Sequence, residues 1–460
     1  VPAAQHVDAL SVDTTGRASA VVVRGSLYWL THRDGPARTI ADTPGVRVRL
    51  PEMLGTGGQV AYVTDAEGED AIEIAYLPRA SGAREPRRLA AGQLGRVQEL
   101  VSDPDGERLA IASHDGRLLL VTVPDDEAAE DGAAGASDGE GEVTELIRSL
   151  NGPVRDLAFS PDGTWLTWSH PGIGRSLRKI KLARIEGPGA RTVIDVTNGR
   201  FEDENPVFTR DGRYLAFLSW RGFDPVYDVH TGDLSFPLGC RPYLVPLSSA
   251  TPSPFALLPD GRPAAGGLDP DADGDDSSGD GTVTVEAEGL ASRVTPFPVA
   301  ASKYSALCPV SGGGLVWLRW PISGALGETF ANPADTSGRP TLEYFNITKA
   351  KKSELVDHLD WFATRGDERL TMSGGWHDAG DLSPFGAPGR KAADLAIFDV
   401  TGLAFAGSLH DPVAALLFFA EEGVAGLPAV SLRTRRTVCF VPGRSGSAGS
   451  SSRRPTTTEM

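Results

Sequence analysis

Serine is the residue type in this sequence that would supply a catalytic nucleophile if a base lay beside it. Ser445 and Ser447 stand in the run Gly443-Arg444-Ser445-Gly446-Ser447, which lacks the Gly-x-Ser-x-Gly spacing of a nucleophile elbow and a preceding strand-to-helix pattern. Covalent catalysis needs a nucleophile held against a base that a third group orients. No local signature supplies that arrangement, so we predict no catalytic residue in this chain.

Residues able to bind a metal ion are scattered or lie in acidic runs. The eight histidines form no pair at a spacing suited to zinc. Alternating aspartates that begin at Asp269, followed by Gly274 and Asp280, resemble the oxygen spacing of a calcium loop. However, Asp replaces the closing Glu, and Asp276 stands at a position that is usually apolar. We favour a solvated acidic loop over a calcium site, and predict no metal and no cofactor.

The polar side chains best placed to bind a ligand share one long connection. These candidate substrate-binding residues are Arg221, Asp224, Tyr227, Asp228 and His230. Connections between strands commonly carry binding groups, so contact with a peptide or a protein partner is one interpretation. The residue types favour a structural alternative, in which the aspartates form side-chain-to-backbone turns and the tyrosine anchors the loop.

A repeated hairpin must position these side chains. A short apolar strand enters a tight polar turn and leaves as a second apolar strand, and the three sharpest copies turn at Pro104-Asp105-Gly106, Pro161-Asp162-Gly163 and Arg210-Asp211-Gly212. Such turns favour a preset φ early and a residue that tolerates positive φ late. Four looser copies turn near residues 14–16, 55–58, 311–314 and 365–367.

Seven hairpins about 40 to 57 residues apart, with one gap of about 100, indicate the blade repeat of a propeller. We predict an all-β fold, a seven-bladed β-propeller of four-stranded antiparallel blades, with each hairpin as the two inner strands of a blade. Stacking around an axis buries apolar faces that a single blade would expose. Strands 118–123 and 179–185 would lie further out. The tryptophans at strand positions would serve packing.

The predicted propeller occupies residues 1–375, with a long insertion at about 223–300. From 376 to 460 the hairpins stop, and we predict an irregular tail that ends in a Gly/Ser/Arg/Thr-rich run. One interpretation is that this tail is out of frame with the parent gene. The alternative is a genuine flexible appendage.

Composition narrows the class of protein. The 460 residues carry a net charge of −17, which disfavours nonspecific binding to nucleic acid or to an anionic membrane. Three cysteines without a CxxC pair suit a reducing compartment better than a disulfide framework. No signal peptide is visible, and the apolar stretch 412–420 is too short to span a bilayer. We therefore expect a cytoplasmic chain.

A longer pattern surrounds the fifth hairpin. Residues 204–219 lead into Phe223-Asp224-Pro225-Val226-Tyr227-Asp228-Val229-His230, and then into 233–237, 241–245 and 251–255. This stretch resembles the second propeller of the tricorn protease family, and the run 351–356 is also similar to that family. The Ser-Pro-Asp-Gly turn alone is shared with TolB-like propellers, whereas the run from Asp224 to Asp228 is not. The resemblance covers roughly residues 8–373.

The resemblance implies that this chain is the seven-bladed portion of a serine peptidase (a hydrolase) that degrades oligopeptides, with the propeller as substrate filter or channel. Its partners would be oligopeptides, and a homo-oligomer would form through parts outside this sequence. The family's catalytic region does not follow residue 372, so the chain alone is expected to be inactive. The alternative is a self-standing TolB-like propeller that binds a protein partner.

Overall fold

The structure, a computed structural model, describes most of the chain up to residue 357 and three later strands. The described ranges are 7–14, 18–31, 37–55, 58–77, 85–124, 141–174, 176–228, 233–255, 282–310, 314–321 and 338–357, with 361–364, 369–375 and 393–399 as backbone. His230, the calcium-like run and the two C-terminal serines lie outside these ranges.

The first four sheets each contain four antiparallel strands in chain order. The first has β1 (Val7–Val12), β2 (Ala18–Val23), β3 (Ser26–Thr31) and β4 (Arg38–Ala41), and the second has β5 (Val48–Leu54), β6 (Gln59–Thr64), β7 (Ala71–Tyr76) and β8 (Arg87–Leu89). The third has β9 (Val97–Ser102), β10 (Arg108–Ser113), β11 (Arg117–Thr122) and β12 (Val143–Arg148). The fourth has β13 (Arg155–Phe159), β14 (Trp165–His170), β15 (Lys179–Arg184) and β16 (Val193–Asp195).

The later sheets carry the additions to this pattern. The fifth contains β17 (Glu202–Phe208), β18 (Tyr214–Trp220), β21 (Cys240–Pro246) and β22 (Thr295–Pro296), and a separate two-stranded sheet, β19 (Val226–Asp228) with β20 (Asp233–Ser235), interrupts it between β18 and β21. The sixth contains β23 (Lys303–Val310), β24 (Gly314–Trp320), β25 (Thr341–Asn346) and β26 (Lys351–Val356). The seventh has three described strands, β27 (Trp361–Thr364), β28 (Arg369–Gly375) and β29 (Ala393–Asp399).

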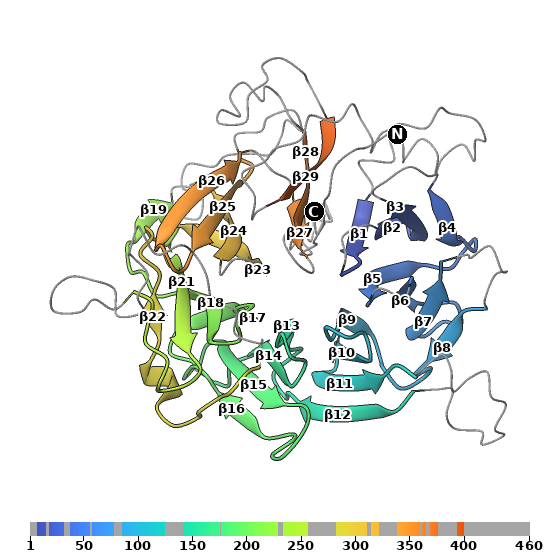
Figure 1. The fold of residues 1–460 in the computed structure, drawn as a ribbon, viewed down its shortest axis with the longest axis horizontal. Coiled ribbons are helices and arrows are strands. Elements are labelled where there is room, and N and C mark those ends of the chain that lie inside the picture. The colour runs from blue at the N-terminus through green and yellow to red at the C-terminus, as the bar shows by residue number, and fades with distance from the viewer. Residues whose placement is uncertain are drawn as a thin grey trace, which may run out of the picture.

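The sheets surround a common centre, and Figure 1 shows the first strand of each sheet nearest to it. The ring closes because β27 contacts both β23 and β1. Apart from a short 3-10 turn at Leu290–Ser292, the described residues contain no helix. The predicted all-β propeller is confirmed, and seven sheets agree with the seven predicted hairpins. No helix among the described residues is long and apolar enough to cross a membrane.

The Asp-Gly turns form as their residue types predict. Gly106, Gly163 and Gly212 adopt φ values of 80°, 67° and 68°, which lie in the left-handed region that favours glycine. The first residue of each turn fastens it. Asp103 Oδ1 accepts hydrogen bonds from three successive backbone amides, and Ser160 Oγ accepts one from Trp165 N at 2.9 Å. These bonds hold the two inner strands of a blade at a fixed spacing.

Antiparallel alternation gives the ring two distinct faces. Connections between the first and second strands, and between the third and fourth, emerge at one face, which we call the turn face because the Asp-Gly turns lie there. Connections between the second and third strands, and from one sheet to the next, emerge at the opposite face, which we call the loop face. The β19–β20 hairpin therefore belongs to the loop face.

Buried aromatic side chains pack between the fifth and sixth sheets. Phe297, Trp317 and Phe345 are each at most 1 % exposed, and their ring centroids lie 5.0 to 5.8 Å apart. Trp165 and Trp168 are also buried, as the sequence predicts. Such rings contribute large buried areas to each blade interface.

The predicted domain boundaries remain predictions, but two strands bear on them. The stretch 223–300 contains β21 and β22 of the fifth sheet, so only parts of it are additional to the blade. Residues 282 and 283 reach back to the fourth sheet, where Val283 N donates to Asp162 Oδ2 at 2.8 Å and Val283 O accepts from Trp165 Nε1. Strand β29 lies beyond the boundary predicted at residue 375 and pairs with β28.

Candidate functional site

The innermost strands share a bulge at one position of the repeat. Leu50, Asp156, Asn205 and Ala306 adopt φ values of 49° to 58°, and the strand register shifts at each of them. A bulge leaves backbone amides without partners in the sheet ladder and aims a side chain out of its regular direction. Side chains of the neighbouring blade bind several of these amides.

A ladder of polar side chains links the third, fourth, fifth and sixth sheets around the centre. The Glu99 carboxylate accepts hydrogen bonds from Asp156 N at 2.8 Å and Leu157 N at 2.7 Å. Asp156 Oδ2 in turn accepts from Asn205 N at 3.1 Å. Asn205 Oδ1 then accepts from Leu307 N at 2.6 Å. Each blade thus fastens the bulge of the next one.

The first three sheets are joined by different residues, but again a side chain of one sheet binds the backbone of the next. Ser11 Oγ of the first sheet accepts from Met53 N of the second at 3.0 Å. The second sheet binds both backbone groups of Val97, because Asp70 Oδ2 accepts from its amide and Arg49 Nη1 donates to its carbonyl. Side-chain hydrogen bonds therefore cross all five junctions between the first and sixth sheets.

The carboxylates near the centre are held in an unfavourable electrostatic setting. Burial and, to a smaller extent, the neighbouring Asp156 carboxylate raise the pKa of Glu99 to about 8, although the two backbone donors oppose the shift. Like charges and low solvation both disfavour the ionised form. The ladder therefore combines firm positioning of the inner strands with a carboxyl group that titrates near neutral pH.

The sequence analysis missed this ladder, although it left a signal. Glu99, Asp156 and Asn205 each stand four residues before the first residue of a turn, at Asp103, Ser160 and Thr209. A polar residue at the same position of three otherwise apolar strands indicates a side chain that does not face the core. The partner amides lie 57 and 102 residues away from Glu99 and Asn205, and sequence spacing cannot reveal them.

The candidate Arg221 lies at the start of the β18–β21 connection and is engaged within the blade. Its guanidinium donates to Ser219 Oγ at 2.7 Å and lies 3.4 Å from Asp203 Oδ1. It also covers three aromatic rings, at 4.3 Å from the Tyr243 centroid, 4.8 Å from Phe201 and 5.8 Å from Phe217. Burial raises the pKa of Asp203, against the lowering effect of Ser219, Thr197 and Arg221.

The other candidates in this connection differ in exposure. Asp224 is exposed, and the Tyr227 side chain is 61 % exposed. Asp228 is described as backbone at the end of β19, and His230 lies outside the described residues. The structure thus places Arg221 in the blade and carries Asp224 and Tyr227 outward on the loop face. Their role in substrate binding stays a prediction.

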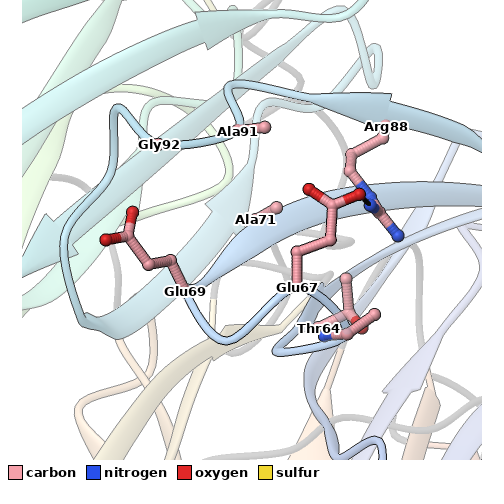
Figure 2. A pocket seen from close by; sticks show the side chains of 8 residues that line it. Thr64, Glu67, Glu69, Ala71, Arg88, Ala91 and Gly92 are labelled. Carbon is pink, nitrogen blue, oxygen red and sulfur yellow. Dashed lines mark hydrogen bonds and ion pairs between the residues drawn. The ribbon is translucent and has the colours of Figure 1, made fainter.

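A cavity of about 170 Å³ lies on the loop face of the second sheet. It is lined by Thr64, Ala66, Glu67, Glu69, Ala71, Arg88, Ala91 and Gly92. Figure 2 shows the Glu67 carboxylate turned toward Arg88, while Glu69 points away from it. Arg88 also pairs with Glu73 at 2.6 Å, so the charges at this cavity largely satisfy one another. Among the described residues, no group of three His, Cys, Asp or Glu side chains could hold a metal ion.

The fold and its inner wall define a β-propeller whose blades are joined by side-chain-to-backbone hydrogen bonds, and the comparisons give the family. Residues 7–373 match the model of the tricorn protease second beta propeller domain. Over 432 residues the chain is 69% identical to tricorn protease homolog 2 of Streptomyces coelicolor, an alignment that covers 80% of this chain and 37% of that protein. The chain belongs to the tricorn protease family.

Two further comparisons agree with this assignment. Tricorn protease homolog 1 of Streptomyces coelicolor is 46% identical over 375 residues, which is 81% of this chain and 33% of that protein. The crystal structure of the tricorn protease superimposes with a TM-score of 0.62 at 18% identity, over 81% of this chain and 32% of that one, which supports the fold. The chain spans about a third of the length of these relatives.

Proposed function

We propose that this chain is the propeller portion of a tricorn-type serine protease and guides oligopeptides to a catalytic region elsewhere in the full protein. The observation that carries the proposal is the 69% identity to tricorn protease homolog 2 across the propeller. No catalytic residue is assigned to the chain itself. Peptide contact is proposed at Asp224, Tyr227 and Asp228 of the loop-face connection, and at His230, which lies outside the described residues.

The inner wall supports a guiding role for physical reasons. Hydrogen bonds across the blade junctions hold the first strands in one position, so the centre of the ring is lined by a preorganised surface. The side chains of the ladder are already hydrogen-bonded to backbone amides of the neighbouring blades. A passing peptide would therefore meet many weak contacts rather than one tight site, which suits transit better than retention.

The test is a binding titration combined with a hydrolysis assay. Fluorescently labelled, uncleavable oligopeptides of graded length are titrated against the chain, and cleavable versions are incubated with it. We expect saturable binding without hydrolysis. Asp224→Asn combined with Tyr227→Ser should weaken binding at least threefold, whereas Glu107→Gln, an exposed residue on the turn face, should not.

Other outcomes would change the proposal. Hydrolysis that a serine-directed inhibitor abolishes would place a catalytic site within the chain. Absence of peptide binding at millimolar peptide would refute the guiding role and leave the alternative, a self-standing propeller that binds a protein partner. A cytoplasmic location is also proposed, and fractionation of the native cells tests it.

A further inference from the structure

The connection that contains the β19–β20 hairpin carries apolar side chains that the blade does not bury. Phe223 is 83 % exposed, Tyr227 61 %, Leu234 53 % and Phe236 38 %. Single exposed hydrophobic residues are ordinary on a protein surface, whereas several on one short segment call for an explanation. The hairpin is additional to the four strands of its blade, so these residues lie outside the fifth sheet.

Strand register and a ring contact bring the four side chains together. Tyr227 pairs directly with Leu234, and directly opposed residues of an antiparallel pair lie on the same face. Phe236 follows Leu234 by two residues at the end of β20, and side chains two apart on an extended strand share a face. The Phe223 and Phe236 ring centroids lie 5.5 Å apart. We call these four side chains the apolar hairpin face.

Backbone contacts fix the base of the hairpin to the blade. The amides of Arg221 and Gly222 both donate to Gly239 O, at 3.0 and 2.9 Å, and Gly239 N donates to Phe236 O at 3.2 Å. A Cβ at Gly222 would lie 2.9 Å from Leu238 O, so the two chains approach more closely than a side chain allows. A two-stranded ribbon has little stability of its own, and these contacts hold it against the fifth sheet.

The size of the apolar hairpin face suits a short peptide segment better than a folded partner. Scaled by exposed fraction, its four side chains offer on the order of 400 Å². A stable complex of two folded proteins buries about 800 Å² on each partner. One aromatic side chain buries about 150 to 250 Å², so one or two large side chains of an extended peptide would cover this face.

The same connection carries negative charge. Asp224 is exposed, and Asp228 pairs with Asp233 at the end of the hairpin. No Lys or Arg stands between residues 222 and 240, and Arg221 is engaged with Asp203 and aromatic rings within the blade. A cationic group is therefore the complementary partner for this segment.

We infer that this connection selects oligopeptides in which an apolar or aromatic side chain stands next to a cationic group, either a basic side chain or a free amino terminus. The apolar side chain packs on the apolar hairpin face, and the cation lies beside Asp224. The inference rests on the proposed function, because it assumes that peptides reach the loop face, and it adds which peptides are preferred there.

The experiment measures the affinity of the chain for a matched series of peptides. Labelled, uncleavable octapeptides carry Phe, Leu or Ser at one position and Lys, Gln or Glu at the next, and a further pair places Phe beside a free or an acetylated amino terminus. Fluorescence anisotropy gives each Kd. We expect Phe and Leu peptides to bind about fivefold more tightly than Ser peptides, and Lys peptides about threefold more tightly than Glu peptides. High salt should weaken the second difference and not the first.

Variants separate the two contributions. Tyr227→Thr combined with Leu234→Thr keeps residues that favour strands, and should remove the preference for Phe over Ser while the preference for Lys over Glu stays. Asp224→Asn should do the reverse. Val226→Thr is the matched control, because Val226 precedes Tyr227 in β19 and lies on the opposite face of the hairpin, and it should change neither preference. All variants should melt within about 2 °C of the unmodified chain.

Three results would overturn the inference. Equal affinity for Phe, Leu and Ser peptides would remove the selection and leave the guiding role intact, because peptides would still bind. Absence of binding by every peptide in the series would refute the guiding role as well. A concentration-dependent dimer of the chain, lost in the Tyr227→Thr and Leu234→Thr double variant, would show that a second copy occupies the apolar hairpin face.

Discussion

Glu99 shows at the scale of one residue how a side chain serves a neighbouring blade. Its carboxylate binds two backbone amides of the fourth sheet, which replaces the ladder bonds that the bulge removes. The same position brings it close to the Asp156 carboxylate. The group is therefore a structural acceptor whose ionised form the fold disfavours.

This setting predicts a pH dependence. Folding raises the pKa of Glu99 from 4.5 to about 8, so the folded state holds the proton over a window in which the unfolded state releases it. Stability attributable to Glu99 is present below about pH 4.5 and is lost as pH rises toward 8, by at most about 1.4 kcal/mol per pH unit. Urea unfolding of wild type and Glu99→Gln between pH 5 and 8 measures it. The variant should lose less stability across this range, whereas Glu107→Gln should follow wild type. Parallel curves for wild type and Glu99→Gln would contradict the assignment.

Arg221 supports a second prediction at this scale. Arg221→Met leaves the buried Asp203 carboxylate without its cation, so we expect a loss on the order of 3 kcal/mol in the free energy of unfolding. Asp224→Asn and Tyr227→Ser, at exposed positions, should each change it by about 0.5 kcal/mol or less. Chemical denaturation at pH 7 checks all three. If Arg221→Met leaves the free energy of unfolding unchanged, the guanidinium has no structural role and is available for a ligand.

The inner strand is the element in which the bulge, the turn and the blade junction meet. Each bulge reverses φ at one residue, exposes amides toward the neighbouring blade, and still allows the strand to reach its turn in register. Asn suits this position because it tolerates the left-handed conformation and carries an acceptor.

Substitution of Asn205 separates these two properties. Asn205→Ala loses the acceptor for Leu307 N and places a Cβ-bearing, non-Asn residue at φ 52°. We expect a cost of about 2 to 3 kcal/mol. Asn205→Gly loses only the acceptor, and should be about 1 kcal/mol more stable than the alanine variant. Thermal and urea unfolding of the two variants test this order, and the reverse order would show that the backbone conformation at this site is not strained.

The whole molecule depends on closing a ring of sheets. Each sheet buries its faces against two neighbours, so the seventh sheet protects both the first and the sixth. The family match ends at residue 373, before β29, the last strand that the structure describes.

Truncation tests this dependence. A chain that ends at residue 399 should melt within about 2 °C of the full chain, whereas one that ends at residue 357 should melt at least 10 °C lower, or in more than one step, because the ring is open. Differential scanning calorimetry provides the measurement. A further chain that ends at 375 reports whether β29 stabilises the seventh sheet. Unchanged melting of the 357 truncation would contradict ring closure by the seventh sheet.

The propeller could be predicted from the sequence, because each hairpin is encoded locally. Strand alternation and Asp-Gly turns depend on residues fewer than about twenty positions apart, and their sevenfold recurrence indicates the architecture. The stretch from Asp224 to Asp228 was sufficient to suggest the family that the comparisons confirm.

The contacts between polar residues of different blades could not be predicted from the sequence. The Glu99, Asp156 and Asn205 ladder joins residues in different blades, and Arg221 lies against Asp203 and aromatic rings rather than in the open loop. Which connections share the loop face likewise depends on the direction in which they leave their sheets. Local propensity forms a strand and its turn, but contacts between distant strands depend on how the blades stack, and stacking follows from the packing of the complete ring.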